Sequence, residues 1–220
     1  MNKNLIIMFV KEPKLGFVKT RLAKTLGEEK TLEIYKHFVN DLINTLKTTK
    51  YEFKLCVYPD KQLINETFGD FNNFIQEDGN LGVKMKKAFQ SQFELGYEKI
   101  ILIGSDTPHI PKEYFNKTFT MLNKKESVIG PSLDGGYYLI AFNKNTFKPS
   151  IFQNITWSSE LVLKQTLQKV NKSTIYLLEQ LNDIDNQKDL EDFYTQYKDS
   201  YFSTSNSITY LKDIQWKNLM

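Results

Sequence analysis

The sequence predicts an α/β domain of three layers, in which a mostly parallel sheet of the Rossmann-like kind is covered by helices on both sides. Short apolar runs of strand length alternate with amphipathic helical patterns along the chain, and this alternation is typical of strands joined by crossover helices. The 220 residues, 40% of them hydrophobic, suffice for one core and are marginal for two. We therefore expect one domain over 1–199 and a C-terminal extension of unknown role at 200–220.

The first strand is expected at 5–10, at the centre of the sheet, because six consecutive apolar residues fit a strand buried on both faces. Residues 28–47 place apolar side chains three and four positions apart, which predicts an amphipathic helix. The other strands are expected at 53–58, 74–76, 99–103, 127–130, 137–142 and 174–178. The other helices are expected around 85–93 and at 111–122, 159–170 and 187–197.

Composition narrows the classes of partner and cofactor. The 29 basic and 26 acidic residues leave a net charge of +3, too small an excess to predict a nucleic-acid partner. With only His37, His109 and Cys56, a metal site of the His/Cys type is nearly excluded. Any metal site must then rest on carboxylates, which favours magnesium or manganese.

The sequence also bears on location. No apolar run exceeds six residues, far short of the about 20 that cross a bilayer. We expect no membrane span, no signal peptide and a cytoplasmic location. Nothing in the sequence predicts the oligomeric state.

The segment that follows the first expected strand is rich in basic residues. Ligands of open parallel sheets bind beyond the carboxyl ends of strands, so these cations and the backbone of the loop are candidates to hold a di- or triphosphate. Arg21 is the only arginine of the chain, and its guanidinium can bind two phosphate oxygens at once. The alternative is a solvated, lysine-rich turn. The candidate residues are Lys11, Lys14, Gly16, Lys19, Thr20 and Arg21.

Asp106 follows the expected strand at 99–103 within the segment Gly-Ser-Asp-Thr-Pro. It is a candidate ligand for a metal ion that bridges phosphates. The alternative is a helix cap or an Asx turn before Pro108, for which aspartate and serine are favoured.

Two glycine-rich segments are weaker candidates. Residues 130–136 join two expected strands, and their Asp-Gly step predicts a hairpin turn. The functional alternative is that Asp134, Gly135 and Gly136 contact a sugar or an acceptor. The second segment opens the helix after the third strand and offers Gly79, Asn80 and Gly82 as further substrate contacts.

A pair of aspartates follows the last expected strand. Asp183 and Asp185 point to one side if the segment is extended, which would place one of them beside a metal ion held by Asp106. Asp185 or Asn186 is equally suited to cap the following helix.

The ordered set of these segments resembles a family of small bacterial proteins described as GT-A-like glycosyltransferases of unassigned substrate, within the nucleotide-diphospho-sugar transferase superfamily. The resemblance runs from about residue 4 to residue 197. Its motifs are FVKEP, GFVKTRL, GNLG, GSDTP, GPSLDGGYY, WSS and DID.

The resemblance implies a GT-A fold, a nucleotide near the first loop and a divalent metal ion near Asp106. By similarity to the nucleotidyltransferases of that superfamily, Asp185 would be the second metal ligand. Lys19, Arg21 and Asp106 are then the expected catalytic residues.

Three functions compete. The first is metal-dependent nucleotidyl transfer from a nucleoside triphosphate to a small phosphorylated or hydroxyl acceptor, slightly favoured because the loop has more cations than a diphosphosugar needs. The second is glycosyl transfer from a nucleotide-sugar to such an acceptor. The third, less favoured, is nucleotide binding without catalysis.

Overall fold

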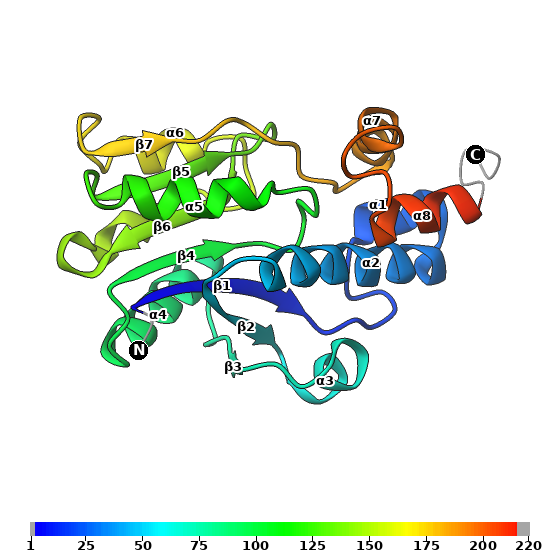
Figure 1. The fold of residues 1–220 in the computed structure, drawn as a ribbon, viewed down its shortest axis with the longest axis horizontal. Helices are drawn as coiled ribbons and strands as arrows, with labels where there is room; N and C mark the ends of the chain where they lie inside the picture. Colours follow the sequence, from blue (N-terminus) through cyan, green and yellow to red (C-terminus); the bar gives the residue numbers. More distant parts are fainter. Residues whose placement is uncertain (1–2, 215–220) are drawn as a thin grey trace.

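A mixed sheet runs through the computed structural model, which describes residues 3–214. Within this range the sheet has seven strands in the order β3-β2-β1-β4-β6-β5-β7, and helices cover both of its faces (Figure 1). The fold is therefore of the expected α/β class. The strands are β1 (Asn4–Lys11), β2 (Glu52–Tyr58), β3 (Asn73–Ile75), β4 (Lys99–Ile103), β5 (Ser127–Pro131), β6 (Tyr137–Asn143) and β7 (Ile175–Leu177).

β6 is the one strand of this sheet that runs against the others. It pairs antiparallel with both β4 and β5, whereas every other pairing is parallel. β1 lies between β2 and β4, with Ile6 opposite Phe53 and Ile101. The first strand is thus inside the sheet as expected, one place from the middle strand β4, and it is almost wholly buried.

Eight α-helices and two short 3₁₀ turns lie within residues 3–214. The helix expected at 111–122 begins one residue later, after Pro111, and α2 and α7 have the expected bounds. The α-helices are α1 (Thr20–Leu26), α2 (Glu28–Lys47), α3 (Gln62–Phe68), α4 (Leu81–Glu94), α5 (Lys112–Met121), α6 (Val162–Leu167), α7 (Gln187–Tyr197) and α8 (Asn206–Asp213), and the 3₁₀ turns are η1 (Lys144–Thr146) and η2 (Pro149–Phe152).

Some expected bounds were wrong for local reasons. The helix expected at 159–170 is shortened to α6, because Ser158 has a left-handed φ of 61° and the next three residues form turns. Helices α1, α3 and α8 were not expected at all. Each has only seven or eight residues, about two turns, too short for an apolar period to show.

Each face of the sheet has its own apolar core. On one face α2, α3 and α5 pack over side chains such as Ile6, Met8 and Val10. On the other face α4, α6 and η2 pack over Leu5 and Ile7. Successive side chains of β1 point to opposite faces of the sheet and so belong to both cores, which is why its sequence is continuously apolar.

A third apolar cluster lies at the carboxyl end of the parallel strands, on the right of Figure 1. It joins α1, α2, α7 and α8, with Leu22 of α1 fully buried among them. The cluster fixes the loop between β1 and α1 to the rest of the fold. It includes α8, so part of the segment 200–220 packs on the domain; residues 215–220 lie outside the described range.

Asp41 of α2 holds the first turn of α8. Its carboxylate is 4% exposed and accepts hydrogen bonds from the backbone N–H groups of Asn206 (2.7 Å) and Ser207 (3.0 Å). The side chains of the same two residues donate as well, at 2.8 and 2.6 Å. A buried carboxylate with four donors ties α8 to the helix pair α1–α2.

We predict that Asp41→Asn lowers the free energy of unfolding by about 2 kcal/mol, because an amide oxygen and an amide N–H cannot replace two accepting oxygens. Urea denaturation measures the change. Asp213→Asn, an exposed change within α8, is the matched control and is expected to cost less than about 0.5 kcal/mol. Equal costs for the two variants would show that Asp41 does not hold α8.

His109 is a buried titratable group in the same region. Its ring lies 4.6 Å from that of Tyr197 and 5.4 Å from that of Phe193, measured between centroids. Its Nδ1 has no hydrogen-bond partner, and burial lowers its pKa to about 4. The imidazole is therefore neutral in the folded protein at neutral pH.

This depressed pKa has a predictable effect on stability. The unfolded chain, with a histidine pKa of about 6.5, binds the proton before the folded chain does, so His109 destabilises the fold as the pH falls from about 6.5 towards 4. When the pH falls from 7.5 to 5, the free energy of unfolding should decrease by about 2 kcal/mol less in His109→Phe than in the wild type. The same pH dependence of the unfolding free energy in both proteins, measured by urea denaturation, would contradict the lowered pKa of His109.

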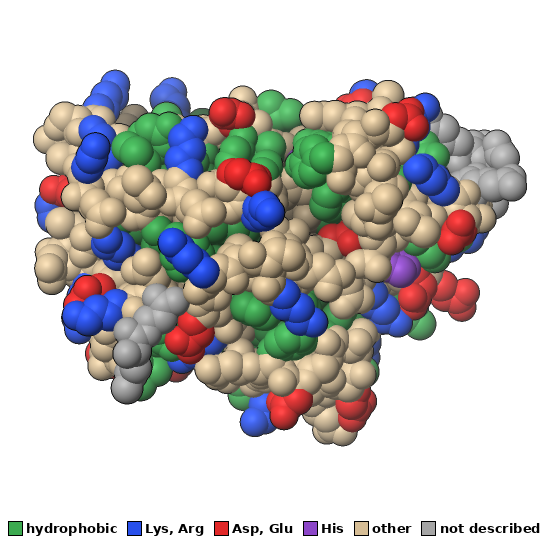
Figure 2. Space-filling view, in the orientation of Figure 1, with side chains coloured by type: hydrophobic (Ala, Val, Ile, Leu, Met, Phe, Trp, Pro, Cys, Tyr) green, Lys and Arg blue, Asp and Glu red, His purple; other side chains and the backbone are tan. Residues whose placement is uncertain are grey.

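Lysine and arginine side chains are scattered over the face shown in Figure 2 and are interspersed with carboxylates. This face therefore presents no continuous basic patch. Among the described residues, no helix is long and apolar enough to cross a membrane.

Candidate functional site

A cleft of about 720 Å³ opens at the carboxyl ends of the parallel strands. Its walls come from the loops after β1, β4 and β7, from the start of α4 and from the turn between β5 and β6. β6 runs in the opposite direction, so its first residues, Tyr137 and Tyr138, line the cleft as well. The cleft lies where ligands bind in open α/β sheets.

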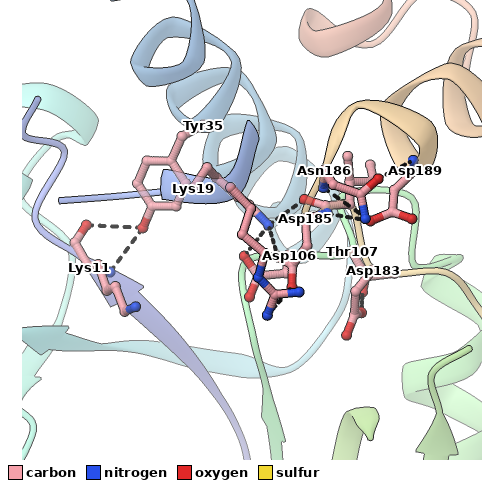
Figure 3. A network of polar contacts seen from close by, with 11 residues as sticks. Lys11, Lys19, Tyr35, Asp106, Thr107, Asp183, Asp185, Asn186 and Asp189 are labelled. Atoms are coloured by element: carbon pink, nitrogen blue, oxygen red, sulfur yellow. Dashed lines mark hydrogen bonds and ion pairs between the residues drawn. The ribbon is translucent and has the colours of Figure 1, made fainter. Parts of the chain in front are cut away.

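Lys19 lies at the centre of this site, between two aspartates (Figure 3). Its Nζ is 2.5 Å from Asp106 Oδ1 and 3.1 Å from Asp185 Oδ1, and it donates to the carbonyl oxygen of Ile184 at 2.6 Å. The side chain is 3% exposed. The basic loop is therefore more than a solvated turn, because one of its lysines is a buried partner of both acids.

The backbone of Lys19 is unusual in a way that fits this position. Lys19 precedes the first residue of α1 with a left-handed φ of 49°, a conformation that lysine seldom adopts. Such strain persists where the surrounding structure fixes it and is frequent at functional sites. The three contacts of Nζ, together with the packing of α1 behind it, supply that constraint.

The backbone brings Asp106 and Asp185 together. Asp106 follows β4, and its carbonyl accepts from the N–H of Ile184 at 3.0 Å, which joins the two acidic segments. Asn186, with Asp189, forms the capping box of α7, so Asp185 is not the cap and its side chain turns to the cleft. Both carboxylates lie near one nitrogen, so their Oδ1 atoms are less than about 6 Å apart.

The charges of the site stabilise one another. Burial lowers the pKa of Lys19, but the two carboxylates outweigh burial and raise it. Burial raises the pKa of Asp185, but the Lys19 ammonium and the Arg21 guanidinium, 3.8 Å from Asp185, outweigh burial and lower it. The Lys19 ammonium and the Arg21 guanidinium therefore offset the charge of the two carboxylates.

Asp183 shows the raised pKa instead. Burial and the nearby Asp106 carboxylate raise its pKa to about 7. The hydroxyl of Thr107 donates to Asp183 Oδ1, and both side chains line the cleft. Asp183 is therefore a functional candidate beside Asp185, the residue of this segment that the resemblance implies as a metal ligand.

The aspartate pair suits a divalent cation by its chemistry. Two carboxylates already converge on one positive charge, that of Lys19, and magnesium commonly takes one or two carboxylates with phosphate and water oxygens as its remaining ligands. Among residues 3–214 no group of three or more His, Cys, Asp or Glu side chains is arranged to hold a metal ion. Asp106 and Asp185 would therefore hold a metal ion only with oxygens from a substrate or from water.

The other selected residues divide into two groups by position. Those that line the cleft are Lys11, Thr20, Arg21, Gly79, Asp134 and Gly136, in addition to Lys19, Asp106 and Asp185. Those that do not line it are Lys14, Gly16, Asn80, Gly82 and Gly135.

Several residues of the second group have structural roles. Asn80 caps α4 by accepting from the N–H of Val83 at 3.0 Å. A Cβ at Gly82 would lie 2.7 Å from both the carbonyl oxygen of Phe152 and the indole of Trp157. A Cβ at Gly135, whose φ is 87°, would lie closer still to the carbonyl oxygen of Glu160. Their backbones shape the walls of the cleft without facing it.

The segment 130–136 forms the hairpin turn between β5 and β6 that its Asp-Gly step predicts. Asp134 Oδ1 accepts from the N–H of Gly136 at 2.8 Å and from the hydroxyl of Ser132. The turn also borders the cleft through Asp134 and Gly136. A structural turn and a contact with a ligand are thus compatible roles for this segment.

The cleft contains residues that the sequence analysis did not select. Lys84 of α4 adds a fourth basic side chain, and Gln76, Trp157, Ser158 and Glu160 complete much of the wall. The Lys84 ammonium lies 3.4 Å from the ring centroid of Tyr58. Trp157 and Ser158 belong to the WSS motif of the resemblance. No local motif marks Gln76, Lys84 or Glu160, so only the topology of the sheet identifies them.

Comparisons with known proteins agree with this architecture. A family model described as uncharacterized protein conserved in bacteria (DUF2064) matches residues 42–159. A 2-phospho-L-lactate guanylyltransferase from Methanocaldococcus vulcanius is 24% identical over 137 residues, which are 61% of this chain and 60% of that enzyme. The match therefore spans less than two thirds of that relative.

Two solved structures are similar in fold. A provisionally assigned nucleotide-diphospho-sugar transferase from Desulfovibrio desulfuricans G20 is 34% identical, covers 98% of this chain and 96% of its own, and has a TM-score of 0.94. Rv0371c from Mycobacterium tuberculosis, solved in complex with manganese, is 12% identical, with coverages of 86% and 96% and a TM-score of 0.55. The second likeness concerns the fold alone.

The ion pairs of Lys19 can be tested by their effect on stability. Asp185→Asn should lower the free energy of unfolding by about 2 kcal/mol in urea denaturation, because the buried ammonium loses one of two anionic partners. In the Lys19→Met background the same change should cost less than half as much. The control Asp192→Asn, in an exposed pair with Lys188, should cost less than about 0.5 kcal/mol. Additive costs in the double variant would contradict the coupling.

Proposed function

We propose that this chain, which belongs to the bacterial family described as uncharacterized protein conserved in bacteria (DUF2064), is a metal-dependent nucleotidyltransferase. It takes a nucleoside triphosphate, transfers the nucleotidyl group to a small acceptor and releases pyrophosphate. The observation that carries the proposal is the meeting of Lys19, Asp106 and Asp185 in a cleft at the carboxyl edge of the sheet.

The charges of the cleft support a triphosphate rather than a diphosphate. Four basic side chains line it: Lys11 at the end of β1, Lys19 in the loop before α1, Arg21 in α1 and Lys84 in α4. Phosphoryl chemistry asks the protein for positioning and for neutralisation of charge more than for proton transfer. The similarity to a guanylyltransferase points in the same direction.

In the proposed reaction an oxygen of the acceptor attacks the α-phosphorus. The bond from that phosphorus to the oxygen that bridges to the β-phosphate breaks, pyrophosphate leaves, and any proton of the acceptor passes to solvent. Lys11, Arg21 and Lys84 bind the phosphate oxygens, and the Arg21 fork can hold two of them at once. Asp106 and Asp185 would hold a divalent ion, which would supply further neutralisation of phosphate charge.

Glycosyl transfer from a nucleotide-sugar is the second candidate. It is favoured by the 34% identical structure, which is named for nucleotide-diphospho-sugar transfer. In that reaction the metal ion and the cations would stabilise a leaving nucleoside diphosphate. The two reactions differ in the released product and in the nucleotide that binds.

A thermal-shift screen of the four nucleoside triphosphates and of common nucleotide-sugars, with and without Mg²⁺, tests the proposal. A true ligand raises the melting temperature by mass action, and we expect a triphosphate with Mg²⁺ to give the largest rise. A larger rise with a nucleotide-sugar would favour glycosyl transfer. No rise with any nucleotide would contradict both reactions.

Arg21→Lys should weaken binding of the best triphosphate about tenfold or more by isothermal titration calorimetry. The charge is retained, but a point ammonium cannot make two parallel hydrogen bonds. Arg21 is 68% exposed, so folding should be unaffected. Lys24→Arg, on the same helix but outside the cleft, is the control and should bind as the wild type does. Unchanged affinity in Arg21→Lys would exclude Arg21 from phosphate binding.

A further inference from the structure

The ammonium of Lys19 lies between the two carboxylates that a metal ion would use. Its Nζ touches Asp106 at 2.5 Å and Asp185 at 3.1 Å, and its side chain is 3% exposed. The aspartate pair thus already has a cationic partner within the chain. A free divalent ion can bind both oxygens only if this ammonium moves away.

We propose that Lys19 excludes free divalent metal ions from the Asp106–Asp185 pair, so that the substrate of this site is the metal complex of a nucleoside polyphosphate. The phosphates of that complex accept the Lys19 ammonium and release the carboxylates to the metal ion. This inference rests on the proposed function for its nucleotide, but the exclusion of free metal by Lys19 can be tested without one.

Charge and burial argue for exclusion by Lys19. Asp106 and Asp185 carry two negative charges, and Lys19 with Arg21, 3.8 Å from Asp185, balances them. A free divalent ion would leave the cluster with excess positive charge and a displaced ammonium without a partner. A buried charge without a partner is costly, so binding of the free ion is opposed.

The anchor of Lys19 strengthens this opposition. The ammonium also donates to the carbonyl of Ile184 at 2.6 Å, and the N–H of Ile184 is bonded to the carbonyl of Asp106 at 3.0 Å. The same two segments therefore hold the carboxylates and the third acceptor of Lys19. A metal ion that binds without a nucleotide therefore breaks all three contacts of the buried Lys19 ammonium.

A polyphosphate changes the balance. It brings anionic oxygens into the cleft, where Lys11, Arg21 and Lys84 can bind it together with Lys19. The flexible stem of a lysine allows its ammonium to turn from the carboxylates to these oxygens. The metal ion then neutralises the carboxylates while the phosphates neutralise the basic side chains, which makes the binding of metal ion and phosphate cooperative.

The test measures Mn²⁺ binding to the full chain without nucleotide, from the electron paramagnetic resonance signal of the free ion. We expect weak binding to the wild type and at least about tenfold tighter binding to Lys19→Met. Lys24→Met, which removes the same charge outside the cleft, should bind as the wild type does. Asp106→Asn in the Lys19→Met background should abolish the gain.

Three results would overturn the proposal. They are an affinity of Lys19→Met equal to that of the wild type, an equal gain in Lys24→Met, or tight Mn²⁺ binding by the wild type alone that Asp106→Asn removes. If circular dichroism shows that Lys19→Met does not fold, Lys19→Gln takes its place.

A measurement on the wild type keeps the proposal testable whatever the variants do. Mn²⁺ is titrated with and without a triphosphate whose α,β-bridging oxygen is a methylene group, and the nucleotide should tighten Mn²⁺ binding by the protein about tenfold or more beyond its binding by the nucleotide alone. Equal binding in both titrations, with the nucleotide bound, contradicts the proposal. Failure of the nucleotide to bind contradicts the proposed function, and the titrations without nucleotide still decide the role of Lys19.

Discussion

The site depends on one interaction, the buried ammonium of Lys19 between the carboxylates of Asp106 and Asp185. It joins three segments that are distant in the sequence but follow β1, β4 and β7 in the fold. Parallel strands end at one edge of a sheet, so their following loops meet there. The other three basic side chains of the cleft and Asp183, with its raised pKa, lie around this contact.

The helices α1 and α7 support this contact. α7 begins directly after Asp185, with Asn186 as its cap, and α1 begins directly after Lys19. Both helices pack with α2 and α8 in one apolar cluster, and Asp41 fixes the first turn of α8. The two helices that position Lys19 and Asp185 are thus parts of one packed unit, which can hold strained backbone such as that of Lys19.

The cleft pairs opposite charges in a chain that has only two histidines and one arginine. Lys19 and Arg21 offset the charges of Asp106 and Asp185, and two further cations, Lys11 and Lys84, line the same cleft. In the proposed function, a ligand that carries both a metal ion and phosphates would exchange these internal partners for external ones. Internal ion pairs of this kind organise a site by its own side chains, which lowers the reorganisation that binding of the proposed ligand would require.

The sequence by itself determined the fold class, most strands, the bounds of α2 and α7, and the segments that border the cleft, because apolar periodicity and strand ends are local properties of the chain. It identified Asp106 and Asp185 as a pair but not Lys19 as their counter-ion. It also selected Asn80, Gly82 and Gly135, which shape the walls of the cleft from outside its lining. Only the tertiary structure decided which charges meet, because burial and distance depend on how remote segments pack and leave no periodic trace in the sequence.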